Sequence, residues 1–313
     1  MQVKFYGNKI CCGSYACLNA MQDPEIDLQL FEISTGTPFG IRHEENGHFD
    51  RLLTTYADPN IGIDHAAFLG GYDTRRKDCA VLEEAAETAR RWVNQNHAVV
   101  MGPVDMGYLS YNPLSSMQRR MDHYIVLKYW SEKEILCIDS EGFAGQRMDD
   151  RELAGCLSVA EVPEAGGKIT LRHFQKRRQF SIEKIVKAAS KQACSNLSHA
   201  ENSGEGSEAI RCCKDYLKGQ LPYLWKLPLA YDIQYLKQRK RLLQYLLELM
   251  EAYEIEKKGT LQRVGEIARI QQNLLDQIYI RTLQGEIDQE KFGWLGEWEA
   301  RLAGTILQDH RRA

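Results

Sequence analysis

The chain has 313 residues, a length that suggests about two domains at roughly 150 residues per domain. Forty Lys and Arg residues against 43 Asp and Glu residues leave a net charge of -3, whereas nucleic-acid-binding proteins normally carry a clear basic excess. No apolar run approaches the roughly 18 residues that a membrane-spanning helix needs, and the first residues lack the pattern of a secretory signal. We therefore expect a cytoplasmic protein with neither nucleic acid nor a membrane as partner.

Nine cysteines make a disulfide framework improbable, because their number is odd and they include the adjacent pairs Cys11–Cys12 and Cys212–Cys213. A reducing compartment fits this pattern better. The sequence has no CxxC pair, and its histidines show no HxxxH or HxH spacing, so we expect no metal site. A thiolate role stays open for at least one cysteine.

Residues 1–180 are predicted to form an α+β domain. Two helices are expected where apolar residues recur at helical spacing, and three strands where short runs rich in Val, Ile or Tyr lie between turns. The helices are Ser14–Met21 and Ala80–Asn94, and the strands are Ala98–Gly102, Tyr124–Tyr129 and Glu134–Asp139. The last two strands are separated by a short connection, so we expect them to pair as an antiparallel hairpin.

Residues 181–313 have a different, helical character. Ser181 is a plausible N-cap for a short helix, and the polar stretch Ser195–Ser207 is expected to be a loop. From about Tyr231 onward, two apolar stripes recur at helical spacing, which is typical of a helix bundle with a shared core. The stripes are Leu236, Leu243, Leu247 and Met250, and then Leu261, Ile267, Ile270, Leu274 and Ile278. We expect this domain to act as a lid or as a dimer surface, which makes a homodimer possible.

The first candidate for chemistry is a cysteine cluster at the start of the first predicted helix. Cys11 and Cys12 precede Gly13 and Ser14, and Cys17 follows one turn later. A cysteine at a helix start lies near free amide N–H groups and the positive end of the helix dipole, which lower the pKa of its thiol. The alternative is that these cysteines are small core residues at a strand-to-helix junction.

The second candidate is a histidine and a carboxylate at the ends of the predicted hairpin. His123 begins one strand and Asp139 ends the next, so the hairpin places the two side by side. A carboxylate that holds the second nitrogen of an imidazole is the arrangement used by catalytic triads. Taken singly, His123 could be a satisfied core residue and Asp139 a turn residue.

A third group, Asp105, Tyr108 and Tyr111, follows a buried-looking strand. These residues could line an acceptor pocket in which Asp105 offsets the charge of an amine, or they could cap a turn and pack internally. Arg119 and Arg120 lie just before His123 and could contact a phosphate group or the acidic surface of a partner protein that carries the substrate. Exposed paired arginines are also common on solvated loops.

From about Lys9 to Val159 the sequence resembles the N-terminal domain of the butirosin biosynthesis protein H family. Four stretches carry the resemblance: Cys12-Gly13-Ser14, Val104-Asp105-Met106-Gly107-Tyr108-Leu109-Ser110-Tyr111, Asp122-His123-Tyr124 and Asp139-Ser140-Glu141-Gly142-Phe143. The resemblance implies a papain-like cysteine-peptidase fold with an antiparallel sheet. It also implies an acyltransferase that takes an acyl group from a carrier-protein thioester and passes it to an amine in specialised-metabolite biosynthesis, as in antibiotic assembly.

Carried over residue by residue, the resemblance makes Cys12 the nucleophile, His123 the base and Asp139 the orienting acid. Cys11 is the alternative nucleophile. Related papain-like families place a glutamine before the nucleophile as an oxyanion donor, and Asn8 is the nearest amide side chain in this chain. The implied partners are an acyl carrier protein, whose phosphopantetheine carries the donor, and a small amine-bearing acceptor. No other cofactor is implied.

Three classes of function follow from these residues. The first is acyl transfer through a cysteine acyl-enzyme, and the second is hydrolysis by the same triad, as a thioesterase or an amidase/peptidase. The third is an interaction protein without enzymatic activity, in which the three residues are incidental. Covalent labelling of Cys12 by an acyl thioester separates the first two from the third.

Overall fold

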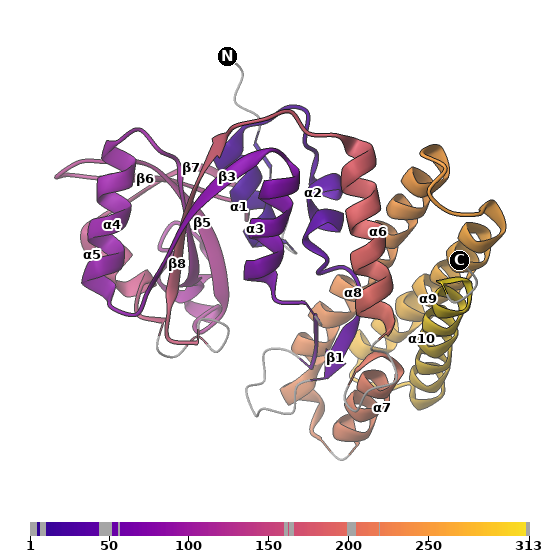
Figure 1. Cartoon of the computed structure of the whole chain (residues 1–313). Helices are drawn as coiled ribbons and strands as arrows, with labels where there is room; N and C mark the ends of the chain where they lie inside the picture. The colour runs from indigo at the N-terminus through magenta and orange to yellow at the C-terminus, as the bar shows by residue number, and fades with distance from the viewer. Residues whose placement is uncertain are drawn as a thin grey trace. The chain divides into compact units, whose positions relative to one another are not determined.

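The computed structural model describes residues 5–6, 11–43, 52–55, 57–159, 162, 166–198, 205–218 and 220–310. It divides the chain into two compact units. The first unit comprises residues 1–31 and 67–179, and the second comprises residues 32–66 and 180–313 (Figure 1). The expected division near residue 180 coincides with one of these boundaries. The segment 32–66, which we expected in the first domain, packs instead with the helical unit.

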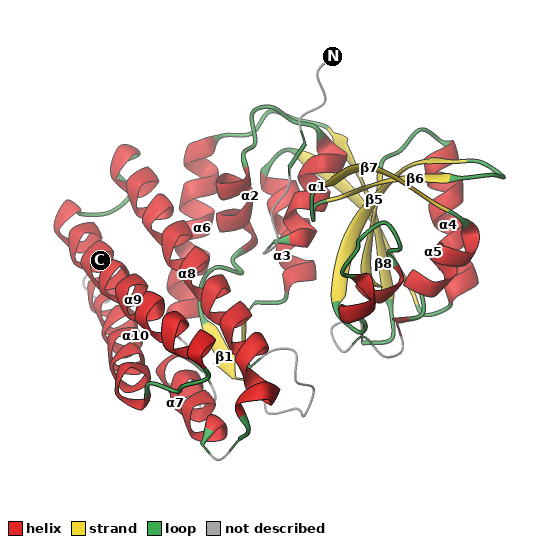
Figure 2. Ribbon diagram, turned by 180° about the vertical axis from the view of Figure 1, so that it is seen from behind, coloured by secondary structure: helices red, strands yellow, loops and turns green. Residues whose placement is uncertain are grey.

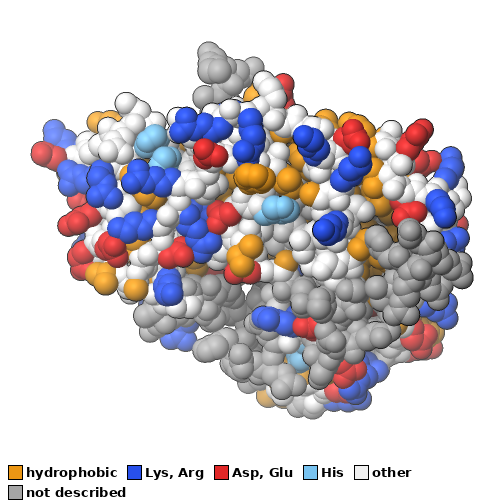
Figure 3. Space-filling view, in the orientation of Figure 1, with side chains coloured by type: hydrophobic (Ala, Val, Ile, Leu, Met, Phe, Trp, Pro, Cys, Tyr) orange, Lys and Arg blue, Asp and Glu red, His pale blue; other side chains and the backbone are white. Residues whose placement is uncertain are grey.

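The first unit is built on a six-stranded sheet in which every neighbouring pair is antiparallel. Its strand order is β3-β8-β4-β5-β6-β7. The strands are β3 (Tyr72–Cys79), β4 (Val99–Asp105), β5 (Asp122–Trp130), β6 (Ile135–Asp139), β7 (Phe143–Met148) and β8 (Ile169–Lys176). The edge strand β3 carries exposed charges of both signs, which discourages pairing with another chain, and such charges are interspersed over this unit in Figure 3.

Helices cover both faces of this sheet (Figure 2). On one face lie α4 (Leu82–Asn94) and α5 (Asp150–Cys156), whose apolar sides join alternate residues of the strands in a single core. On the other face lies α1 (Cys12–Met21), which contacts β5, β4 and β8. Its six consecutive residues from Ser14 to Asn19 are all buried, because its side chains are small or apolar on every side. The mixed α+β class expected for this part of the chain is therefore confirmed.

The predicted elements of the first unit are present with modest changes of boundary. β4 continues to Asp105, and β5 starts at Asp122, one residue before His123. β5 and β6 pair antiparallel, as the short connection between them predicted. Two short 3₁₀ helices, Met106–Tyr108 and Ser115–Met117, lie between β4 and β5. The sequence patterns did not reveal β3 and β8, which pair with each other along their full length.

The second unit is mainly helical. Its long helices are α6 (Ile182–Ser198), α7 (Gly206–Leu217), α8 (Pro222–Ala252), α9 (Lys258–Gln284) and α10 (Gln289–His310), and its small sheet pairs β1 (Ile41–His43) with β2 (Leu53–Thr55). Helices α2 (Leu28–Thr35) and α3 (Pro59–Leu69) lie where the chain passes between the units. α6 extends through Ser198, beyond the start of the loop expected at Ser195, and α8 begins at Pro222, nine residues before the expected start of helical sequence.

The two apolar stripes lie in the core of the helical unit or at its edge, with Leu247 and Ile270 half-buried and the other members buried. The segment 32–66 is attached to this unit by a buried carboxylate. Asp232, which is fully buried, accepts hydrogen bonds from the backbone N–H groups of Leu52 and Leu53 at 2.7 and 2.9 Å. Ile41, Leu52 and Leu53 also belong to the apolar core formed by α7, α8, α9 and α10. This packing explains why the segment leaves the first unit.

All nine cysteines carry free thiols. Within the described residues, none of the helices combines the length and the apolar character needed to cross a membrane.

Candidate active site

The backbone places Cys12 at the first position of α1, with Cys11 as the N-cap residue. The side chain of this N-cap residue does not cap the helix, and its carbonyl oxygen accepts the N–H of Tyr15 at 3.0 Å. Cys11 is buried, whereas Cys12 keeps part of its surface exposed. Of the two adjacent cysteines, Cys12 is therefore the one that lies within the helix and is the less buried residue.

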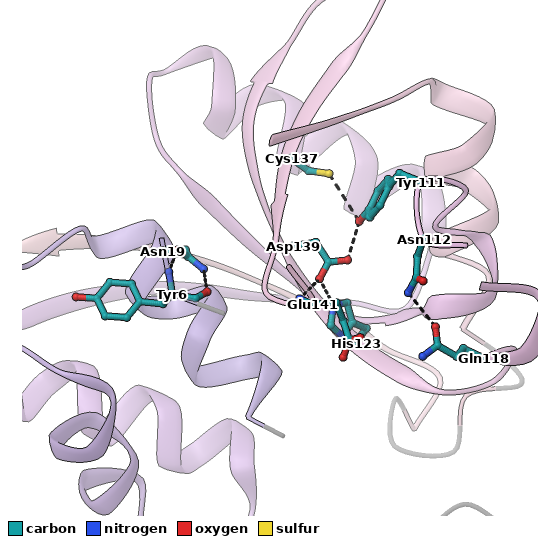
Figure 4. Close-up of polar contacts among 9 residues, drawn as sticks. All are labelled: Tyr6, Asn19, Tyr111, Asn112, Gln118, His123, Cys137, Asp139 and Glu141. Atoms are coloured by element: carbon teal, nitrogen blue, oxygen red, sulfur yellow. Dashed lines mark hydrogen bonds and ion pairs between the residues drawn. The ribbon is translucent and has the colours of Figure 1, made fainter. Parts of the chain in front are cut away.

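The hairpin of β5 and β6 brings His123 and Asp139 together. Ile125 of β5 pairs with Asp139 of β6, and His123 comes two residues before Ile125 along β5. The start of β5, which carries His123, therefore lies beside the end of β6, which carries Asp139. His123 Nε2 lies 2.6 Å from Asp139 Oδ1, and both side chains are buried. This pair lies at the centre of the contacts drawn in Figure 4.

The Cys12 thiol completes this arrangement, because α1 packs on β5 and β6 and places the thiol close enough to His123 for each group to shift the pKa of the other. Since Nε2 of the ring is engaged by Asp139, Nδ1 is the nitrogen left for the thiol. The structure thus brings together three residues from α1, β5 and β6 in the order thiol, imidazole and carboxylate. This is the geometry in which a histidine can take a proton from a nucleophile while a carboxylate orients its ring.

The electrostatics of the pair favour a strong base. Burial alone would lower the pKa of His123, but its bonds with Asp139 and Cys12 raise it well above the ordinary value. Burial alone would raise the pKa of Asp139, yet hydrogen bonds from His123, the Glu141 backbone and Tyr111 hold it below the ordinary value. Asp139 therefore stays ionised beside the imidazole and increases its affinity for a proton.

The surroundings of Cys12 act on the pKa of its thiol in opposite directions. Burial raises the pKa of its thiol, and the hydrogen bond and charge of His123 offset part of this effect. The carboxylate of Asp122 also raises it. Asp122 is half-buried at the start of β5, directly before His123, so this carboxylate lies near the Cys12 thiol without belonging to the triad itself. In the sequence it was named only within the stretch Asp122-His123-Tyr124, with no role of its own.

Tyr111 was expected in an acceptor pocket, but its hydroxyl is directed at the triad. It donates to Asp139 Oδ2 at 2.9 Å, and the Cys137 thiol lies 3.9 Å from the same hydroxyl (Figure 4). The ring of Phe143 packs edge-on against the tyrosine at a centroid distance of 5.3 Å. Tyr111 therefore contacts the Asp139 carboxylate through its hydroxyl.

The other members of that group have structural contacts of their own. Asp105 is buried, and its Oδ1 accepts the backbone N–H groups of Gly107 at 2.8 Å and Arg120 at 3.0 Å. The guanidinium of Arg119 lies 5.1 Å from the ring centroid of Tyr108. Asp105 thus caps a turn and ties the loop before β5 to the end of β4. The acceptor pocket of Asp105, Tyr108 and Tyr111 stays a prediction.

The amide expected to assist an oxyanion, Asn8, lies outside the described residues. Another asparagine, Asn19 of α1, fixes the nearby chain instead. Its side chain accepts the Tyr6 N–H at 2.9 Å and donates to the Tyr6 carbonyl at 2.8 Å (Figure 4). A donor that the described part does supply is the backbone N–H of Cys12, at a helix start where the first four N–H groups have no intrahelical acceptor.

No protein-family model matches the chain. A stretch of 144 residues is 30% identical to the uncharacterized protein YobF of Bacillus subtilis (strain 168). The match covers 44% of this chain and 45% of YobF, so the chain spans less than half the length of this relative.

Proposed function

We propose that the chain is a cysteine acyltransferase in which Cys12 accepts an acyl group from a thioester and passes it to an amine. The observation that supports this proposal is the contact of Cys12 with His123, whose other ring nitrogen is held at 2.6 Å by the buried carboxylate of Asp139. The same arrangement, together with the antiparallel sheet and the helix that begins at the cysteine, supports a papain-like fold for the first unit.

The first half-reaction forms an acyl-enzyme. His123 accepts the proton of Cys12, and the thiolate attacks the carbonyl carbon of the thioester. The new bond joins this carbon to Cys12 Sγ, the bond to the donor sulfur breaks, and the leaving thiolate takes the proton from His123. One thioester replaces another, so this step is close to balanced in energy. A carrier phosphopantetheine, as implied by the resemblance to the butirosin protein H family, is the donor that we propose.

The second half-reaction transfers the acyl group to the acceptor. An amine attacks the acyl carbon on Cys12, its proton passes to His123, and the sulfur of Cys12 leaves and recovers that proton. An amide forms from a thioester, which makes this step favourable. Water competes with the amine for the same carbon, so exclusion of water decides between transfer and hydrolysis.

A charged group near the nucleophile supports an amine as acceptor. Asp122 lies close enough to Cys12 to raise the pKa of its thiol, and its side chain is half-buried. A carboxylate there attracts a cationic acceptor by the same field that opposes the thiolate. A diamine or polyamine suits this environment, since one amino group can pair with Asp122 while another, unprotonated, attacks the acyl group.

The proposal is tested by mass spectrometry of the full chain incubated with an N-acetylcysteamine thioester. We expect an adduct of one acyl group on Cys12, which disappears when putrescine is added and yields the monoacyl diamine. The Cys12→Ala variant should form no adduct. Loss of the adduct without amide product would identify a thioesterase or amidase, and absence of any adduct would favour an interaction protein. The lid or dimer role of the helical unit stays a prediction.

A further inference from the structure

The carboxylate of Asp139 has an uneven distribution of hydrogen bonds between its two oxygens. Oδ1 accepts from His123 Nε2 at 2.6 Å and from the backbone N–H of Glu141 at 2.8 Å. Among the described residues, the donor to Oδ2 is the hydroxyl of Tyr111, at 2.9 Å. Because Asp139 is fully buried, an oxygen left without a donor there would be costly.

The direction of the Tyr111 hydrogen bond is fixed by chemistry. The phenol has a single proton, and the ionised carboxylate can only accept, so this proton points to Asp139. The Cys137 thiol, 3.9 Å from the hydroxyl, donates to the phenol oxygen from its other side. Burial and the neighbouring Asp139 raise the pKa of Tyr111 far above its ordinary value, which keeps the proton in place.

The position of the ring is also fixed. Phe143 packs edge-on against it, and the ring lies against the apolar core on the α4 and α5 side of the sheet. The hydroxyl therefore approaches Asp139 from a rigid support, opposite the side on which His123 binds. Three donors on three separate segments hold the plane of the carboxylate.

We propose that Tyr111 is a positioning residue of this site, which orients the Asp139 carboxylate toward His123 and thereby controls the reactivity of Cys12. This inference deepens the proposed function and rests on it. Without the hydroxyl, the carboxylate can turn about its own bond, and its negative charge is shared with fewer donors. Both effects act on His123, with which Tyr111 makes no hydrogen bond of its own.

The test replaces Tyr111 by Phe in the full chain, and the matched control is Tyr72→Phe. Tyr72 belongs to the same unit, is buried, and donates to Asp23 Oδ2 at 2.9 Å, the same bond length to the same group. Loss of a buried tyrosine–carboxylate bond is therefore common to both variants. Contact with the triad is specific to Tyr111.

We expect Tyr111→Phe to lower kcat for acyl transfer from the N-acetylcysteamine thioester by about 10-fold, because loss of one hydrogen bond to a charged group is a change of about this size. KM should change by less than about two-fold, since the residue does not touch substrate. The pKa of His123, followed by NMR of its ring protons, should rise, because a carboxylate with fewer donors holds the imidazolium more strongly. Tyr72→Phe should leave kcat and the His123 pKa at their wild-type values.

An unchanged His123 pKa, or equal effects of the two tyrosine variants, would overturn the positioning role. If Tyr111→Phe does not fold, site-specific 3,5-difluorotyrosine at position 111 gives the opposite test. Its more acidic hydroxyl is a stronger donor, so the His123 pKa should fall, and an unchanged value would again overturn the role. The NMR titration does not depend on acyl transfer, so failure of the proposed function would be seen separately, as absence of an acyl group on Cys12.

Discussion

Replacement of Asp139 by Asn removes one charge from the triad and leaves its shape nearly unchanged. The side chains are isosteric, and the Asn carbonyl can still accept from His123 Nε2 and the Glu141 N–H, which share Oδ1 in the wild type. The amide nitrogen then faces Tyr111, whose hydroxyl must turn to accept. We therefore expect a folded protein with an altered imidazole.

The expected change in the His123 pKa follows from the charge interaction that is lost. The nearest atoms of His123 and Asp139 are 2.6 Å apart, and the centres of the two charged groups lie somewhat farther apart. Two unit charges about 4 Å apart interact with about 4 kcal/mol at an effective dielectric constant of about 20, which corresponds to about 3 in pKa. The retained carbonyl acceptor offsets part of this loss. We expect the pKa of His123 to fall by about 1 to 3, because the carboxylate that stabilises the imidazolium is gone. A weaker base takes the Cys12 proton less readily, so transfer should slow by about 10- to 1000-fold.

The assay combines two readouts of the same pair. NMR titration gives the His123 pKa, and the rate of Cys12 alkylation by iodoacetamide as a function of pH reports the thiolate. The alkaline limit of the thiolate–imidazolium pair is set by loss of the imidazolium proton. In Asp139→Asn this limit should move to lower pH by the same amount as the His123 pKa.

The matched control is Asp23→Asn. Asp23 is also a buried carboxylate that accepts from a tyrosine, a backbone N–H and a basic side chain, here Lys176 at 2.5 Å. It should lose stability without changing Cys12 alkylation. The reasoning is refuted if Asp139→Asn leaves the His123 pKa and the alkylation profile unchanged, or if Asp23→Asn changes them equally.

Three further outcomes are expected. Cys12→Ala should abolish the acyl adduct seen by mass spectrometry and Cys11→Ala should retain a measurable part of it, whereas the reverse result would move the nucleophile by one residue. Asp122→Asn should lower the pKa of Cys12, so that alkylation occurs at lower pH. It should also raise KM for putrescine several-fold, which corresponds to a loss of about 1 kcal/mol in binding free energy. An unchanged KM would show that Asp122 does not bind the acceptor. The fragment 1–180 contains the segment 32–66 without its helical partners, so it should aggregate in size-exclusion chromatography, and a monomeric, fully active fragment would contradict both this packing and a required helical unit.

The central residues of the candidate site could be predicted because their placement is local. A short hairpin puts the start of β5 beside the end of β6, so the 16-residue spacing of His123 and Asp139 was informative. The helix start at Cys12 was likewise visible in the Gly13-Ser14 that follows it. Contact between Cys12 and the hairpin depends on how α1 packs on the sheet, which the sequence indicated only through the family resemblance.

The features that were missed depend on partners far away in sequence. β3 and β8 carry many polar residues, and their pairing joins segments such as Tyr72 and Lys176 that no local pattern connects. The segment 32–66 follows the helical unit because Asp232 binds Leu52 and Leu53 some 180 residues away. Tyr111 looked like a pocket residue because nothing in its neighbourhood along the chain identifies Asp139 as its acceptor.

The two buried tyrosine–carboxylate pairs of the first unit show what makes the candidate site distinctive. Asp23 and Asp139 each accept a tyrosine hydroxyl at 2.9 Å, and both have a pKa below the ordinary value. At Asp23 the third partner is Lys176, whose side chain has a single nitrogen, and this nitrogen binds the carboxylate. At Asp139 it is an imidazole, whose second ring nitrogen is left to face Cys12. The same carboxylate environment therefore holds a lysine in one place and, in the proposed mechanism, supports an acid–base relay in the other, and the difference lies in the basic residue that each carboxylate binds.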